Sequence, residues 1–157
     1  MHMETEERLV AAARKVLDEM LVPLGYEFEV TVNCGEEGPE LMIGTADAKY
    51  LIGENGDRLD DLQYLVNRLV QAEWPDAPRV RVDCEHYREQ AEARLLRRAR
   101  SRAEHVLRTG RSLQMEPLNA YQRRLVHNEL AKMPGIATAS EESDSRFKRI
   151  TISRIGE

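Results

Sequence analysis

The chain has 157 residues, of which 23 are Lys or Arg and 28 are Asp or Glu, giving a net charge of −5. This length suffices for one domain or two small ones, and a hydrophobic fraction of 41% argues against wholesale disorder. No stretch approaches the roughly 18 consecutive apolar residues of a membrane-spanning helix, and charged residues stand where the apolar core of a signal peptide would lie. Two cysteines are too few for a disulfide framework. The sequence therefore predicts a cytoplasmic protein without membrane insertion.

The first part of the chain shows both helical and alternating patterns of apolar residues. In chain order, the predicted elements are a helix over residues 4–21, strands over 26–32 and 40–45, a short helix over 46–52, a long helix that starts at Asp57 and ends before Trp74, and a strand over 79–84. Asp57 is expected to cap the long helix, with Asp60 in the capping-box position. The apolar stripe of this helix is predicted to be Leu59, Leu62, Leu65, Val66, Leu69 and Val70.

The second part of the chain repeats the mixture of helices and strands in another order. The predicted elements are a helix over residues 87–108, a short strand over 112–116, a helix over 120–132, and strands over 136–141 and 146–154. No Gly- or Ser-rich linker separates the two parts, so a fixed junction is expected. The sequence therefore predicts an α+β protein of two small domains, residues 1–86 and residues 87–157.

Charge is distributed unevenly between these two parts. Residues 1–86 hold 8 Lys or Arg against 19 Asp or Glu, a net charge of −11, whereas residues 87–157 hold 15 against 9, a net charge of +6. The second part should attract nucleic acid and the first should repel it. Helical spacing gathers four arginines as an auxiliary basic face: Arg94, Arg97, Arg98 and Arg102. A solvated helix face would explain the same arginines equally well.

A Gly-x-x-Gly sequence joins the short helix to the long helix of the first part, at Gly53, Glu54, Asn55 and Gly56. A turn between helices that needs small residues would explain this pattern by itself. The functional alternative is a backbone clamp, because glycines let a nucleic-acid backbone approach and the next helix offers unpaired N–H groups and the positive end of its dipole. A KH domain holds nucleotides with such a loop.

The stretch over residues 51–67 resembles the KH signature of the bacterial Jag family, the SpoIIIJ-associated proteins. The resemblance implies a type II KH fold, with the order α-β-β-α-α-β, whose loop residues and Arg58 contact the nucleic-acid backbone. Members of this family often carry Lys or Arg at the two variable loop positions, where this chain has Glu54 and Asn55. Because negative charge near a phosphate lowers affinity, a role of the first domain in binding another protein stays open.

Arg123 and His127 are four residues apart on a predicted helix and therefore share one face. Arg offers a planar fork for phosphate, and His offers a ring that can stack on a base or donate to phosphate. Arg124 extends the polar edge of this face. Judged by spacing alone, a solvated helix face explains the pair better than a binding site does.

Residues 119–127 are similar to the hallmark of the R-3-H domain, which follows the KH domain in the Jag family and is named for an Arg and a His separated by three residues. The family commonly has Glu where this chain has Gln122. The resemblance implies helices packed on a small three-stranded sheet, and it implies binding of single-stranded RNA or DNA through Arg123, Arg124 and His127.

Other chemistry finds little support in the sequence. Cys84 and His86 could offer two metal ligands, but the tight ligand pairs of a structural zinc site are missing. No Walker loop is present, and no arrangement of nucleophile and base suggests an enzyme. The sequence thus predicts a non-enzymatic protein without cofactor that binds single-stranded RNA. The alternative is an adaptor whose acidic KH half pairs with a KH-only protein or with itself, while the R-3-H half alone binds RNA.

Overall fold

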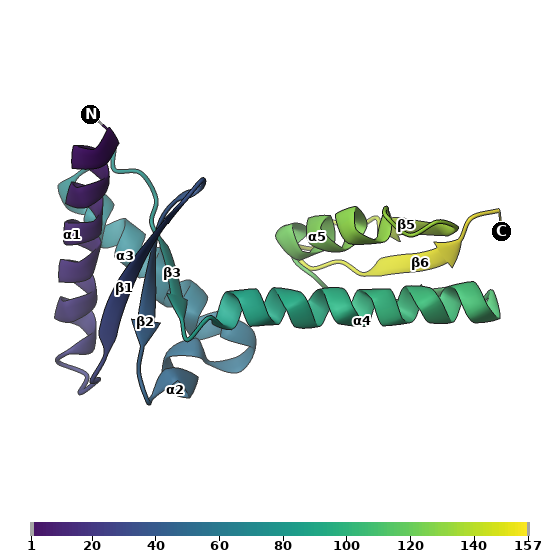
Figure 1. Ribbon diagram of the computed structural model, residues 1–157, viewed down its shortest axis with the longest axis horizontal. Coiled ribbons are helices and arrows are strands. Elements are labelled where there is room, and N and C mark those ends of the chain that lie inside the picture. Colours follow the sequence, from purple (N-terminus) through teal and green to yellow (C-terminus); the bar gives the residue numbers. More distant parts are fainter. Residues whose placement is uncertain (1, 157) are drawn as a thin grey trace. The chain divides into compact units, whose positions relative to one another are not determined.

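The computed structural model describes residues 2–156 and shows a mixed α and β protein with two small sheets (Figure 1). The chain divides between Arg88 and Glu89 into two compact units, which we call the N-terminal unit and the C-terminal unit. Over the described residues, no helix combines the length and the apolar character needed to cross a membrane.

The N-terminal unit has the predicted order of elements. These are α1 (His2–Leu21), β1 (Glu29–Gly35), β2 (Gly38–Gly44), α2 (Ala48–Ile52), the 3-10 turn η1 (Glu54–Gly56), α3 (Asp57–Glu73) and β3 (Arg81–Cys84). The sheet order is β1-β2-β3, with β1 antiparallel and β3 parallel to β2. β1 begins later than predicted, but the alternation holds, because Val30 and Val32 face inward while Glu29 and Thr31 are exposed.

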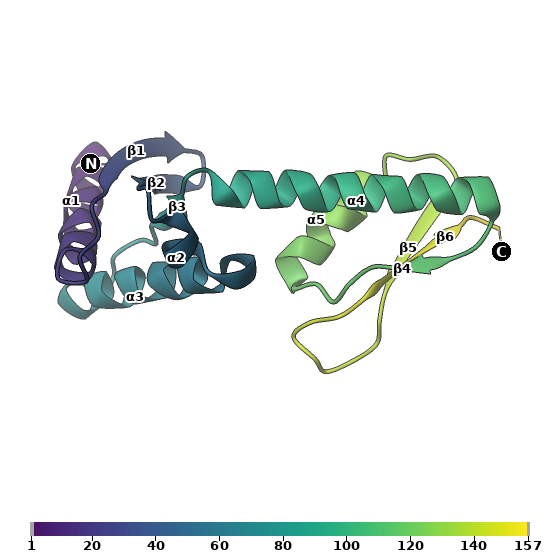
Figure 2. The same cartoon turned by 90° about the horizontal axis from the view of Figure 1, so that it is seen from below.

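Helices α1 and α3 cover one face of this sheet (Figure 2) and form an aliphatic core with it. The sheet contributes Leu41, Ile43 and Val82, none of which is exposed. The predicted stripe of α3 is wrong at two positions, since Leu65 and Leu69 are 44% and 46% exposed. Successive residues of a helix are turned by about 100°, so each of these leucines lies to the side of a stripe that is complete without them: Leu59, Leu62, Val66 and Val70.

The predicted cap of α3 is also wrong. Gly56, in the left-handed conformation with φ of 80°, occupies the N-cap position and makes no side-chain capping bond. Asp57 already has helical angles, with φ of −62° and ψ of −44°. An N-cap side chain acts from a non-helical residue, so Asp57 instead accepts the N–H of its neighbour Arg58 at 2.7 Å.

The junction between β3 and α4 (Tyr87–Thr109) is held inside the N-terminal unit. Glu85 and His86 both adopt positive φ, at 49° and 57°. Asp83 is only 2% exposed, and its carboxylate accepts the backbone N–H of Cys84 at 2.7 Å and that of Arg88 at 3.2 Å. A buried carboxylate therefore satisfies the N–H of Arg88 and fastens the first turn of α4 to β3.

The C-terminal unit continues α4 and adds β4 (Leu113–Gln114), α5 (Ala120–Leu130), β5 (Ile136–Ser140) and β6 (Ile150–Arg154), in the predicted order. Its antiparallel sheet has the order β4-β6-β5 and packs against both helices. The predicted last strand is too long, because residues 146–149 belong to the loop before β6. In this stretch Leu118 and Lys148 form an isolated bridge, and the carbonyl of Arg149 accepts the N–H of Glu141 at 2.9 Å.

Candidate nucleic-acid interface

The two glycines of the Gly-x-x-Gly loop are required by contacts within the N-terminal unit. Gly53 has a φ of 71°, and a Cβ atom there would collide with the carboxylate of Asp57 and lie 2.7 Å from Cγ of Arg58. Gly56 is buried, and a Cβ atom there would lie 2.7 Å from Cε1 of Tyr87, the first residue of α4. The loop therefore needs small residues whether or not a ligand approaches it.

Glu54 and Asn55, between these glycines, are exposed. The N–H of Asp57 donates to the carbonyl of Glu54, and the N–H of Arg58 donates to the Asp57 carboxylate. Two donors that could face a phosphate are thus already satisfied, and a carboxylate lies beside them. The Arg58 guanidinium donates to the carbonyl of Tyr50 at 3.1 Å, which holds its charge near the end of α2.

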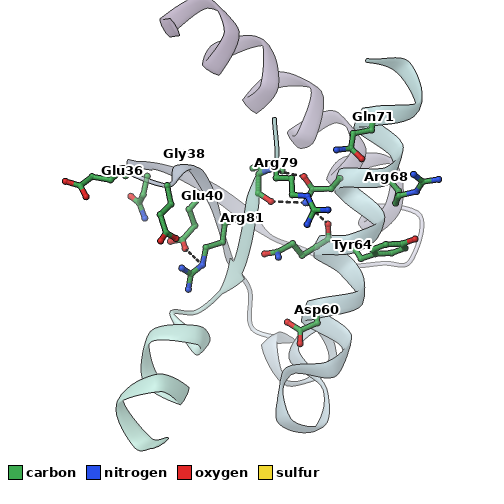
Figure 3. A pocket seen from close by; sticks show the side chains of 15 residues that line it. Glu36, Gly38, Glu40, Asp60, Tyr64, Arg68, Gln71, Arg79 and Arg81 are labelled. Carbon is green, nitrogen blue, oxygen red and sulfur yellow. Dashed lines mark hydrogen bonds and ion pairs between the residues drawn. The ribbon is translucent and has the colours of Figure 1, made fainter. Parts of the chain in front are cut away.

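A groove of about 560 Å³ opens between α3 and the β1–β2 hairpin (Figure 3), and no sequence pattern had indicated it. Its lining is mixed in charge, since it holds three arginines and four carboxylates, and Glu40 pairs with Arg81 on the neighbouring strand at 3.0 Å. The charged lining residues are Arg68, Arg79, Arg81, Glu36, Glu37, Glu40 and Asp60. The alternating pattern of the predicted strand put Arg79 and Arg81 on one polar face, but it did not indicate a groove. The residues that line the groove come from three segments that are distant in sequence, so local spacing could not predict that they lie together.

Amide side chains of α3 close the outer edge of β3 along this groove. Asn67 donates to the carbonyl of Val80 and accepts its N–H, both at 2.9 Å, and Gln63 accepts the N–H of Val82 at 2.9 Å. Arg88 donates to the carbonyl of Val82 at 3.0 Å and pairs with Asp60 at 2.6 Å. An edge strand usually offers such groups to a partner chain, and here side chains satisfy them.

Arg123 in the C-terminal unit is half-buried and bound to backbone. Its Nη1 donates to the carbonyl of Leu118 at 2.6 Å and to that of Arg146 at 3.4 Å. The helix that carries it, α5, starts with a complete capping box between Asn119 and Gln122. Arg123 therefore fastens the start of α5 to the segments before it and before β6.

His127 uses both ring nitrogens within the C-terminal unit. Nδ1 lies 2.6 Å from Oγ1 of Thr138, and Nε2 lies 2.9 Å from Oγ of Ser140, both on β5. Burial and then the nearby charge of Arg123 lower the pKa of His127 below its ordinary value. The ring is accordingly neutral near pH 7, and it links α5 to β5 one turn along the helix from Arg123.

The remaining predicted arginines divide into two groups. Arg94, Arg97 and Arg124 are exposed. Arg98 and Arg102 instead converge on Glu116, with N–O distances of 2.7 and 3.5 Å. Burial alone would raise the pKa of Glu116, but its own backbone N–H and the two arginines hold this pKa below the ordinary value. Two of the four arginines of the predicted basic face, Arg98 and Arg102, thus form ion pairs within the C-terminal unit.

A basic and aromatic segment precedes β6, at Arg146, Phe147 and Lys148, of which the first two are exposed and Lys148 is partly buried. The Phe147 ring is 50% exposed, and the guanidinium carbon of Arg146 lies 5.6 Å from its centroid. These residues were not predicted as candidates, because the alternating pattern had assigned them to a strand. An aromatic residue between two cations was the signal that could have found them.

Metal binding and thiol chemistry gain no support from the geometry. Among residues 2–156, no three side chains of His, Cys, Asp or Glu come together as metal ligands. Cys34 and Cys84 are both free thiols. Burial, followed by the carboxylates of Glu85 and Asp83, raises the pKa of Cys84 to about 11, so this thiol stays protonated and is a poor nucleophile near pH 7.

Comparison with known proteins supplies relatives for both units. Residues 89–154 match the R-3-H domain family. The chain is 33% identical over 150 residues to the RNA-binding protein KhpB of Clostridium symbiosum, covering 94% of this chain and 67% of that relative. It is 31% identical over 136 residues to the KhpB of Lactiplantibacillus plantarum, covering 85% of this chain, and 27% identical over 122 residues to that of Bacillus subtilis, covering 78%. It spans only 42% and 59% of these last two relatives.

Proposed function

Because this chain belongs to the family of the RNA-binding protein KhpB, we propose that it binds single-stranded RNA in the cytoplasm and catalyses no reaction. The observation that carries this proposal is the C-terminal unit. It is an R-3-H domain, and residues 87–157 have a net charge of +6 in a chain of net charge −5. Positive charge concentrated on one unit attracts a phosphate backbone despite an acidic whole.

The proposed contacts with RNA use side-chain groups of the C-terminal unit that can still reach a phosphate. Arg97 and Arg124 are exposed and suit phosphate contacts. Arg123 uses only Nη1 in the two hydrogen bonds described above, which leaves its Nε and Nη2 groups for a phosphate. His127 is held by its two hydroxyl partners, so its proposed part in binding is to fix the face that carries Arg123.

For the N-terminal unit, the proposal is a type II KH domain. The order α-β-β-α-α-β and the Gly-x-x-Gly turn between α2 and α3 support it. In this assignment the N–H groups of Glu54 and Asn55 meet the RNA backbone between Gly53 and Gly56, and Arg58 adds the nearest cation. The carboxylates of Glu54 and Asp57 make this contact weaker than that of the R-3-H domain.

The test measures the affinity of the whole chain for a labelled single-stranded RNA at several salt concentrations by fluorescence anisotropy. Replacing Arg97 and Arg124 together by Gln should lower affinity and reduce the log–log salt slope by about 0.7 for each phosphate that is no longer neutralised. The control is Lys15→Gln on α1, an exposed cation of the other unit, which should change neither. Absence of wild-type binding at low salt would refute the proposal.

A second candidate is an adaptor role of the N-terminal unit. The observation that favours it is a pair of exposed leucines one turn apart on α3, Leu65 and Leu69, which are 44% and 46% exposed, with Tyr64 64% exposed on the same helix. Exposed apolar patches are typical of protein interfaces. If the unit only pairs with a second KH protein or itself, changing Glu54 and Asn55 both to Asp leaves RNA affinity intact. In sedimentation, Leu69→Asp would then abolish self-association or the complex with that partner.

A further inference from the structure

The segment formed by Arg146, Phe147 and Lys148 has a fixed backbone and an exposed ring. On one side, Nη1 of Arg123 donates to the carbonyl of Arg146 at 3.4 Å. On the other, Lys148 and Leu118 exchange two backbone hydrogen bonds of 2.9 and 3.0 Å. The N–H of Phe147 donates to the hydroxyl of Ser145 at 3.3 Å. Anchors on each side therefore hold in place a ring that is 50% exposed.

Cations precede and follow this ring in the sequence. The guanidinium carbon of Arg146 lies 5.6 Å from the ring centroid, and Lys148 follows directly in sequence. Arg149 donates from Nη1 to the carbonyl of Met115 at 3.3 Å, which keeps a third cation beside the segment. The same loop also holds Glu141, Glu142 and Asp144, and the Glu141 carboxylate accepts the backbone N–H of Arg149 at 3.1 Å. Figure 2 shows the loop between β5 and β6 projecting away from α4, so solvent can reach it.

Exposure alone does not distinguish Phe147 from other exposed apolar side chains, but its flat ring is held in place and has cations on both sides in sequence. Nucleobases match its chemistry, because each base offers a flat face for stacking while the flanking cations meet the phosphates on either side. An apolar protein partner would also cover the ring, but it would gain nothing from three adjacent cations. The surroundings of Phe147 therefore favour a single strand of nucleic acid.

We propose that Phe147 stacks on a base of the bound RNA, and that Arg123 acts as its positioning residue through the carbonyl of Arg146. This inference rests on the proposed RNA-binding function and adds the residue that recognises bases to it. Arg123 would then have two roles: it contacts phosphate, and it positions the segment that carries Phe147. Nη1 of Arg123 donates to two carbonyls, and one of them, that of Arg146, belongs to the segment that carries Phe147.

The experiment compares two labelled strands with the full chain: a single-stranded RNA and a strand of the same length that carries abasic sites. Phe147→Ala should weaken binding to the intact strand about ten-fold and leave the abasic strand unaffected. Phe147→Trp should retain affinity, and its fluorescence should be quenched by the intact strand beyond the change that Trp74 alone gives in the wild type. Ile155→Ala removes another exposed apolar residue of the unit, 65% exposed, and serves as the matched control.

The positioning role is read from the ratio of the affinities for the two strands. Arg123→Ala should lower this ratio in the wild-type background and leave it unchanged when Phe147→Ala is already present, because both changes remove the same base stacking. A merely structural defect, or weaker binding of phosphate, would weaken both strands alike and leave the ratio intact.

Three outcomes separate the inference from its premise. If the wild type binds neither strand, the proposed function itself fails. If the wild type binds RNA and Phe147→Ala behaves like the Ile155→Ala control, stacking is refuted while RNA binding stands. If Phe147→Ala weakens both strands equally, the ring supports the loop and recognises no base, which also overturns the inference.

Discussion

At the scale of single residues, His127 shows how one environment sets both a structure and a pH dependence. Burial, followed by the charge of Arg123, lowers its pKa in the folded chain below the ordinary 6.5. Between the folded and unfolded pKa values the unfolded chain binds more protons, so stability rises with pH across this window. His127 therefore stabilises the fold fully above about pH 6.5, and this contribution is lost as the pH falls toward the lower, folded pKa.

Urea unfolding of the wild type and His127→Gln at several pH values between about 5 and 8 measures this linkage. The variant cannot titrate at this position, while His86 and His105 are common to both proteins. The difference in free energy of unfolding, wild type minus variant, should be largest at the alkaline end and shrink on acidification. A difference that grows toward acid pH would show that the ring is charged in the folded state.

At the scale of elements, the Gly-x-x-Gly loop is coupled to the start of α4. Gly56→Ala forces a side chain into the left-handed region and against the ring of Tyr87, so it should lower the free energy of unfolding by about 1–3 kcal/mol. In a Tyr87→Ala background the steric part of this loss should disappear and only the backbone strain should remain. Additive losses in the double-mutant cycle would mean that ring and loop are independent.

Periodicity predicted the order of elements because it records which side of each helix or strand is apolar. It predicted α3 and its inner stripe, but it could not tell that Leu65 and Leu69 stay 44% and 46% exposed. It likewise assigned Asp57 to the cap, because the left-handed Gly56 that takes this position is a backbone feature and carries no side-chain signal.

The candidate site was predictable only where its residues are neighbours in sequence. Helical spacing placed Arg123 and His127 on one face of α5. Their partners, Leu118, Thr138 and Ser140, lie in other segments and depend on how the sheet packs against the helix. Phe147 lies in the loop before β6, and the alternating pattern could not predict that its ring is 50% exposed.

At the scale of the whole molecule, the uneven charge leads to a prediction about where repulsion acts. Residues 1–86 carry a net charge of −11, yet only the carboxylates close to a bound phosphate should oppose it, since exposed charges farther apart than about 8–10 Å are screened at physiological salt. If the Gly-x-x-Gly loop touches RNA, Glu54→Lys should raise affinity and steepen the log–log salt slope by about 0.7.

Asp18→Lys on α1 makes the same change in net charge at an exposed position away from the loop, so it is the matched control for this prediction. Both variants alter the long-range field of the molecule equally, and this part of their effect should vanish together above about 0.15 M salt. If RNA affinity stays raised above this salt concentration for Glu54→Lys but not for Asp18→Lys, the loop itself contacts a phosphate. Equal effects of the two variants at every salt concentration would confine RNA binding to the C-terminal unit, because the loop would then act only through the total charge.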